Sequence, residues 1–152
     1  MKIGVNSHNS KLIRASVTET PRDLLKDDMP ITPEAARNVI SGRRVIQDII
    51  GKKDRRLLVI TGPCSIHDEA AALEYADRLN RLKEKVNETI YLVMRVYFEK
   101  PRTNVGWKGL INDPGLDGSC DMMQGLLKAR AMLLKITEMG LTTATEMLDP
   151  IT

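Results

Sequence analysis

The sequence predicts an α/β protein with a parallel sheet. Two short apolar runs, Leu57–Thr61 and Ile90–Val96, have the length and the β-branched composition of buried strands. A helical stretch capped by Asp68 lies between them, so strand, helix and strand follow one another within about forty residues, the span of a right-handed crossover. A further helix precedes a third expected strand at Thr142–Met147. We therefore expect three parallel strands with covering helices.

The residues before the first strand predict a polar arm and one long helix. Residues 1–30 are polar and weakly periodic, with a brief helical signal at Pro21–Lys26. Thr32 is a good N-cap, Pro33 suits the first helical position, and Gly51 ends the stretch. The apolar face expected for this helix consists of Ala36, Val39, Ile40, Ile46, Ile49 and Ile50.

Two later helices are expected to pack on the sheet. Asp68 begins the first of them, and the second runs from about Asp121 to Met139 and stops at Gly140. The inward face expected for the first consists of Ala72, Tyr75, Ala76, Leu79, Leu82 and Val86. The spacing of five methionines predicts core packing rather than a binding surface: Met122, Met123, Met132, Met139 and Met147.

The composition favours a globular protein that binds small anionic substrates. The chain has 152 residues, of which 42% are hydrophobic, enough for one core. The sequence has no apolar run near the roughly 20 residues of a membrane span and no secretion signal, which predicts a cytoplasmic protein without membrane contact. Cys64 and Cys120 are far apart, so we expect free thiols or a metal ligand rather than a disulfide. A net charge of +3 with 3% aromatic residues disfavours a nucleic-acid surface.

Residues able to carry chemistry follow each predicted strand. Cys64 follows the first strand, Arg95 and Lys100 follow the second, and Glu146 follows the third. Because the carboxyl ends of parallel strands share one face, we expect these side chains to lie together there. Cys64 could present a thiolate to a metal and His67 an imidazole. The competing interpretation is a small apolar cysteine and a loop histidine beside a helix cap.

The segment from Phe98 to Gly118 is a long loop rich in glycine and proline, of a kind usually kept for binding or catalysis. The strand end and this loop carry four cations and a hydroxyl donor: Arg95, Lys100, Arg102, Lys108 and Thr103. This set suits phosphate and carboxylate capture, and the alternative is an ordinary solvated face. Trp107 is expected to anchor the loop by packing. Glu146 could act as an acid or base, pair with a cation, or balance charge.

Three motifs carry a family resemblance. They are LLVITGPCSIHD at 57–68, YLVMRVYFEKPRTNVGWKGLINDP at 91–114 and ATEMLDP at 144–150. Together they closely resemble the class I 3-deoxy-D-arabino-heptulosonate 7-phosphate (DAHP) synthases, the first enzymes of the shikimate pathway. The resemblance implies a (β/α)8 TIM barrel, with residues 1–54 as an N-terminal extension and residues 55–152 as the N-terminal part of the catalytic barrel, about three βα units. The related synthase of the eight-carbon Kdo phosphate shares the GPC turn but resembles this chain less.

The resemblance also implies a metal-dependent transferase. Such enzymes condense phosphoenolpyruvate with erythrose 4-phosphate in aromatic amino acid biosynthesis, and their divalent metal would be manganese, iron, cobalt or zinc. The implied site residues are Cys64 as metal ligand, Arg95 and Lys100 for phosphoenolpyruvate, Arg102 and Thr103 for erythrose 4-phosphate, and Glu146 with Lys100 in catalysis. These assignments agree with the residue types, because the reaction needs a Lewis acid and cations that hold two phosphates.

The chain departs from the family in its length. Family members run to more than twice this length, and their remaining metal ligands, a His, a Glu and an Asp, belong to later strands. The parent enzyme would be a homodimer or homotetramer inhibited by an aromatic amino acid. We expect no turnover from the 152-residue chain alone. The alternative function is that of a non-catalytic assembly or regulatory partner of a complete subunit.

Overall fold

The structure, a computed structural model, describes residues 21–100 and 105–146. The chain forms two compact units, Met1–Pro30 and Ile31–Thr152. In the first unit the described residues form helix α2 (Pro21–Asp28), where the sequence predicts a brief helix. None of the helices in the described ranges is long and apolar enough to span a membrane.

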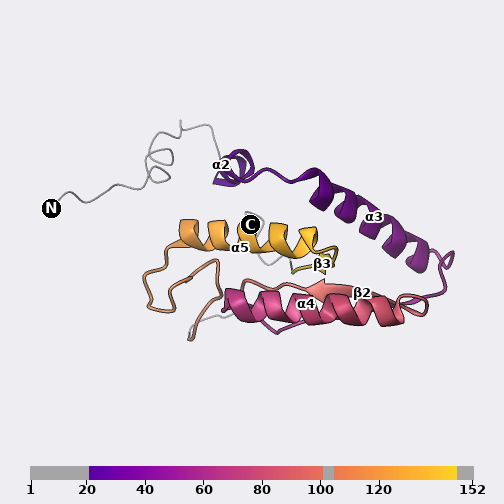
Figure 1. Cartoon of the computed structure of the whole chain (residues 1–152). Helices are drawn as coiled ribbons and strands as arrows, with labels where there is room; N and C mark the ends of the chain where they lie inside the picture. Colours follow the sequence, from indigo (N-terminus) through magenta and orange to yellow (C-terminus); the bar gives the residue numbers. More distant parts are fainter. Residues whose placement is uncertain (1–20, 101–104, 147–152) are drawn as a thin grey trace. The chain divides into compact units, whose positions relative to one another are not determined.

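The second unit alternates helices and strands in the predicted order. Its elements are α3 (Pro33–Ile50), β1 (Leu57–Thr61), α4 (Glu69–Val86), β2 (Ile90–Arg95), α5 (Met122–Glu138) and β3 (Thr142–Ala144). The three strands form one parallel sheet in the order β1, β2, β3, with α4 and α5 running alongside it (Figure 1). The α/β class is therefore confirmed. A closed barrel is not present among the described residues.

The strands end earlier than expected. β2 stops at Arg95 rather than Val96, although the Val96 amide still donates to the Ala144 carbonyl at 2.8 Å. β3 stops at Ala144, and Met147 lies outside the described residues. The expected division between an extension, residues 1–54, and a barrel stays a prediction.

Side-chain caps fix where the helices begin. The Thr32 hydroxyl accepts from the Ala35 amide at 3.2 Å at the start of α3, and Asp68 accepts from the Ala71 amide at 2.9 Å at the start of α4. Asp121 caps α5 in the same way at 3.0 Å. Each cap satisfies an amide that has no partner within its helix. The predicted starts of these three helices are confirmed.

Helices α4 and α5 cover one face of the sheet and form the core with it. The buried members of this core are Ile66, Ala72, Ala76, Leu79, Leu92, Met94, Val96, Phe98, Leu110, Ile111, Ala129, Met132, Ile136 and Leu141. Leu92, Met94 and Val96 alternate along β2 and just beyond it, as expected for one face of a strand. The residues between them, such as Arg95, project to the other face.

Two expectations about these helices are corrected. Leu82 is 47% exposed, whereas Nζ of the next residue, Lys83, donates to the Gly140 carbonyl in the turn after α5 at 2.6 Å. Of the methionines, Met132 is buried in the core, whereas Met122 at the start of α5 is 47% exposed. The core role predicted for the methionines therefore holds only in part.

Helix α3 covers the N-terminal end of the sheet. A Cβ on Gly42 would lie 2.5 Å from Oγ1 of Thr142, the first residue of β3, so only glycine permits this approach. The Asn38 side-chain amide donates to the carbonyls of Thr137 and Leu141 at 3.0 and 2.8 Å. These contacts place α3 across the strand starts and leave the strand ends to other segments.

The expected apolar face of α3 is wrong at two positions. Ile40 is 69% and Ile50 is 71% exposed, whereas Ala35 and Gly42 are buried. The helix packs through small residues and one amide because its neighbours lie close to its backbone. The other large apolar residues of the expected face, Val39, Ile46 and Ile49, are half-buried, so the expectation places the face correctly but extends it too far around the helix.

Candidate functional site

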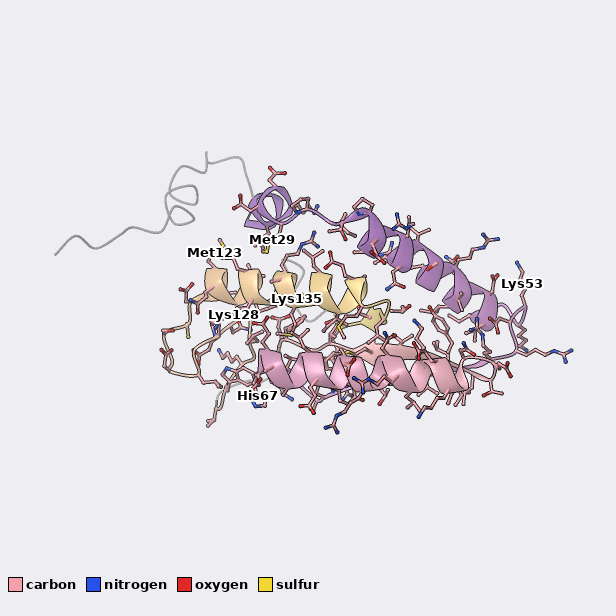
Figure 2. All side chains as sticks on the ribbon, in the orientation of Figure 1. Met29, Lys53, His67, Met123, Lys128 and Lys135 are labelled. Carbon is pink, nitrogen blue, oxygen red and sulfur yellow. The ribbon has the colours of Figure 1, made fainter. Side chains whose placement is uncertain are left out.

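The carboxyl end of the sheet gathers four of the predicted site residues. Cys64 follows β1, Arg95 ends β2, Lys100 lies in the next loop, and Glu146 follows β3. Lys100 contacts Cys64, and Arg95 bonds the carbonyls of the two residues before it, while the charge of Glu146 acts on the pKa of the Cys64 thiol. His67, near Cys64, and Lys53, before β1, lie toward opposite ends of α4 in Figure 2.

The turn after β1 is built against the end of β2. A Cβ on Gly62 would lie 2.3 Å from the Arg95 carbonyl oxygen, so the two strand ends can meet this closely only with glycine here. The Ile66 amide then donates to the Tyr97 carbonyl at 2.8 Å. The backbone on both sides of Cys64 is thereby fixed to the segment that carries Arg95.

Lys100 and Cys64 form a direct pair. Lys100 Nζ lies 2.8 Å from Cys64 Sγ and 3.3 Å from the Cys64 carbonyl oxygen. The hydrogen bond from Lys100, followed by its charge, lowers the pKa of the exposed Cys64 thiol; Arg95 acts in the same direction, and Glu146 opposes it. A thiol in this setting ionises more readily, and the thiolate is the form that binds metals.

The loop after β2 folds back on itself to present Lys100. The Lys100 amide donates to the Lys108 carbonyl at 2.8 Å, next to an antiparallel bridge between Glu99 and Gly109. The Asn112 side-chain amide also donates to the Lys108 carbonyl, at 3.2 Å. These bonds fix the position of the backbone that carries the Lys100 side chain. The predicted residues Arg102 and Thr103 lie outside the described residues.

Arg95 is held by neutral groups. Its Nε donates to the Pro63 carbonyl at 3.1 Å and its Nη2 to the Gly62 carbonyl at 2.8 Å. Its guanidinium carbon lies 5.0 Å from the centre of the Tyr97 ring. Within residues 21–100 and 105–146, no carboxylate lies within ion-pair distance of Arg95. Partners among the described residues thus use two of its five N–H donors, and none of those partners neutralises its charge.

Tyr97 is a site residue that the sequence reasoning missed. It is half-buried, and its guanidinium neighbour Arg95 lies 5.0 Å from the centre of its ring. Burial first, and then the charge and hydrogen bond of Glu146, raise the pKa of the Tyr97 phenol. The signal was available, because residues two apart in an extended chain share a face and Tyr97 lies two positions after Arg95.

The predictions for the surrounding loop are met in part. Trp107 packs against the core, and its Nε1 donates to the Asp113 carbonyl at 2.7 Å, as expected for an anchor. The His67 ring contacts the edge of Trp107 with centroids 6.4 Å apart. Cys120, before α5, is an exposed free thiol with a φ of 56°.

The donor set for a metal is incomplete in the part of the chain that the structure describes. Cys64 offers a soft ligand whose ionisation Lys100 favours, which suits a transition-metal ion. No group of three or more His, Cys, Asp or Glu side chains converges within those residues. A single thiolate does not make a stable metal site, so the described residues would supply one ligand, Cys64, of a site that needs about three or four.

An open hollow lies at the other end of the sheet. It has a volume of about 540 Å³ and is lined by Asp54, Arg55, Arg56, Asn87, Glu88 and Thr89. Its Arg56 binds Asp54 at 2.6 Å, so this cation is already neutralised. The hollow also mixes Arg55 with the carboxylates of Asp54 and Glu88, whereas the carboxyl end brings the cations Arg95 and Lys100 together, which makes it the stronger candidate for an anion site.

Comparisons with known proteins agree with the resemblance in the motifs. The profile of the DAHP synthetase I family matches residues 28–152. The Tyr-sensitive phospho-2-dehydro-3-deoxyheptonate aldolase of Escherichia coli K12 is 52% identical over 94% of this chain, and the Trp-sensitive enzyme of Enterobacter agglomerans is 52% identical over 87%. They are matched over 40% and 38% of their own lengths.

A solved structure gives the same result. The phospho-2-dehydro-3-deoxyheptonate aldolase of Francisella tularensis SCHU S4 superposes with a TM-score of 0.84 at 46% identity, over 91% of this chain and 40% of that one. The chain thus spans about two fifths of the length of the relatives it matches. On these matches, the chain belongs to the DAHP synthetase I family.

Proposed function

We propose that this chain supplies the N-terminal part of a DAHP synthase, including the phosphoenolpyruvate side of its active site. The reaction joins phosphoenolpyruvate to erythrose 4-phosphate and water, and gives DAHP and inorganic phosphate, the first step of the shikimate pathway. The observation that carries the proposal is Arg95, which forms no ion pair with the described residues, beside the Lys100–Cys64 pair at the carboxyl end of the sheet. The family supports a whole fold of the (β/α)8 type, in which active sites lie at this end.

Arg95 and Lys100 would hold phosphoenolpyruvate. That substrate carries a phosphate and a carboxylate, and a guanidinium with unused donors can bind either in a bidentate manner. Lys100 Nζ would turn from Cys64 to the substrate, since a flexible four-carbon stem allows this motion. The two cations would then hold the methylene carbon of phosphoenolpyruvate in a near-attack geometry toward the aldehyde carbon.

The remaining residues would act on the second substrate and on protons. Arg102 and Thr103 would bind the phosphate of erythrose 4-phosphate. The methylene carbon of phosphoenolpyruvate would bond to the aldehyde carbon of erythrose 4-phosphate, and the aldehyde oxygen would take a proton. Water would add to the neighbouring carbon, from which inorganic phosphate leaves. Lys100 and Glu146 are the acid and base candidates for these transfers.

Cys64 would hold the divalent ion, with further ligands from the part of the protein that the relatives have and this chain does not span. When bound, such an ion polarises the aldehyde carbonyl as a Lewis acid. Manganese, iron, cobalt and zinc all accept a mixed set of sulfur, nitrogen and oxygen ligands. With one ligand among the described residues, the 152-residue chain by itself would not turn over substrate.

Regulation and assembly would follow the relatives. The matched relatives include Tyr-sensitive and Trp-sensitive enzymes, so we propose feedback inhibition of the whole protein by an aromatic amino acid. We further propose a cytoplasmic homodimer or homotetramer that binds neither nucleic acid nor membrane.

A chimera tests the proposed function. Residues 1–152 are fused to the part of the E. coli Tyr-sensitive aldolase beyond the matched region, and loss of phosphoenolpyruvate is followed with erythrose 4-phosphate, with manganese or a chelator. We expect turnover that the chelator abolishes, and none from the 152-residue chain. A folded chimera without turnover would contradict the proposal.

A further inference from the structure

The loop that follows β2 closes on itself at its base. Glu99 and Gly109 form an antiparallel bridge there. Next to this bridge, the Lys100 amide donates to the Lys108 carbonyl at 2.8 Å. The direction in which the Lys100 side chain leaves the loop is therefore set at this base.

One side-chain amide bonds both sides of the base. Asn112 Nδ2 donates to the Lys108 carbonyl at 3.2 Å and to Glu99 Oε1 at 3.4 Å. The Lys108 carbonyl thus accepts from the Lys100 amide and from Asn112 together. Asn112 therefore holds the residue before Lys100 and the carbonyl to which the Lys100 amide donates.

The backbone of Asn112 is fixed on both sides. The amide of Ile111, a buried core residue, donates to the Phe98 carbonyl at 3.2 Å. On the other side, the Asp113 amide donates to the Gly109 carbonyl at 2.9 Å. A single side-chain amide on this backbone thus connects the core to the loop of the candidate site.

This connection serves the accessible part of the loop. Lys108 is exposed, and Asn112, Glu99 and Lys100 are half-buried. A hydrogen bond that water can replace contributes modestly to the stability of a fold. A displacement of about 1 Å in a binding group, by contrast, can greatly reduce activity. Asn112 should therefore matter more for the position of Lys100 than for folding.

We propose that Asn112 is a positioning residue: its side-chain amide fixes the base of the loop, so that Lys100 Nζ stays at the carboxyl end of the sheet, 3.3 Å from the Cys64 carbonyl oxygen, where an anionic substrate can bind. The identity of the anion, phosphoenolpyruvate, rests on the proposed function. Without the two bonds from Asn112, the base would loosen and Lys100 would occupy its binding position for less of the time.

The first test uses the active chimera and measures the KM for phosphoenolpyruvate and the melting temperature. Asn112→Ala removes both bonds without adding charge, so the KM should rise about fivefold. Asn80→Asp is the matched control, because Asn80 Nδ2 donates to the Met139 carbonyl at 2.9 Å, between α4 and the residue after α5. This control should lower the melting temperature and leave the KM unchanged, so that a loss of stability alone is distinguished from a loss of position.

A second variant exchanges donor and acceptor. Asn112→Asp made together with Glu99→Gln lets the new glutamine amide donate to the new carboxylate and keeps the net charge of the parent. One of the two bonds is thereby restored. The KM of this double variant should stay within about twofold of that of Glu99→Gln alone.

The outcomes separate the two proposals. A parent chimera without turnover contradicts the proposed function, and hydrogen exchange of the Lys100 amide then decides the role of Asn112. This exchange should be faster in Asn112→Ala than in the parent and unchanged in Asn80→Asp, and equal exchange in Asn112→Ala and the parent would overturn the positioning role. In an active chimera, the role is overturned by an unchanged KM in Asn112→Ala, by the same rise in Asn80→Asp, or by a double variant that is as impaired as Asn112→Ala.

Discussion

At each end of the sheet an arginine lies over a tyrosine ring, Arg56 over Tyr91 at 5.1 Å and Arg95 over Tyr97 at 5.0 Å. At the amino end the Asp54 carboxylate forms an ion pair with Arg56, and helix α3 covers the neighbouring strand starts. At the carboxyl end the arginine bonds two backbone carbonyls instead. Arg56 is thus neutralised by Asp54, whereas Arg95 has no carboxylate partner in residues 21–100 and 105–146 and can bind a ligand there.

The difference arises from the partners that each turn supplies. Asp54 lies two residues before Arg56 and caps the same turn through the Arg56 amide at 2.9 Å, so the ion pair is local. Gly62 and Pro63 offer Arg95 only carbonyl oxygens, which orient a cation without cancelling its charge. A charged residue is a better indicator of function when its partners are neutral.

The largest expected effect comes from replacing Arg95 by alanine in the chimera, with Arg56→Ala as the matched control. Arg95→Ala should lower kcat/KM for phosphoenolpyruvate by about 30-fold or more, since removing one side of a charged, hydrogen-bonded contact costs about 2–5 kcal/mol. Arg56→Ala should change it by less than about twofold. Steady-state kinetics decide, and similar losses from both variants would contradict the division between the ends.

The second effect concerns the metal. Cys64→Ser should weaken manganese binding to the chimera by at least about 100-fold, beyond the effect of residues that only support a ligand, because a hydroxyl replaces an ionisable thiol. Cys120→Ser, which changes the other exposed thiol, should leave binding unchanged. Titration with manganese measures both. Equal affinity of the two variants would remove Cys64 from the site.

The two thiols should also differ in reactivity. Lys100 lowers the pKa of Cys64, so Cys64 should be alkylated faster than Cys120 at neutral pH, and its rate should begin to rise at a lower pH. Lys100→Met removes the hydrogen bond and should shift the Cys64 profile to higher pH. Peptide mapping of the metal-free chimera after timed alkylation gives both rates. An unshifted profile would mean that Lys100 does not stabilise the thiolate.

The smallest effect belongs to the amino end. The hydrogen bond from Arg56 lowers the pKa of Asp54 below its ordinary value of 3.8. A lowered folded-state pKa stabilises the fold fully above the ordinary value, and this contribution is lost as the pH falls through the folded pKa. Asp54→Asn should therefore lower the melting temperature slightly at pH 7, and the difference from the parent should shrink below pH 3.8. A difference that persists in acid would point to a cause other than this charge.

The elements and the general place of the site could be predicted because their signals are local. The helix caps Thr32, Asp68 and Asp121 act within three residues, and the parallel order of the strands follows from the crossover rule. That order in turn predicts that Cys64 and Arg95 meet at the carboxyl end. The core face of β2 follows from simple alternation.

The remaining features depend on contacts between distant segments. The packing face of α3 contains Ala35, Asn38 and Gly42, which only the approach of β3 and the end of α5 explains. The bonds from Arg95 to the turn after β1 depend on how the two strand ends meet. The contact of Lys100 with Cys64 is a further feature that the sequence does not predict, and the role of Lys100 in binding phosphoenolpyruvate stays a prediction. Tyr97 was within reach of the alternation rule but lacks the charge that drew attention to its neighbours.

The central claim is that Arg95 and Lys100 form the phosphoenolpyruvate end of the active site. A crystal structure of the chimera with phosphoenolpyruvate and manganese tests it most directly. We predict anionic oxygens of the substrate within hydrogen-bond distance of the Arg95 guanidinium and Lys100 Nζ, with Cys64 Sγ on the metal. Ordered phosphoenolpyruvate that touches neither cation would contradict the claim.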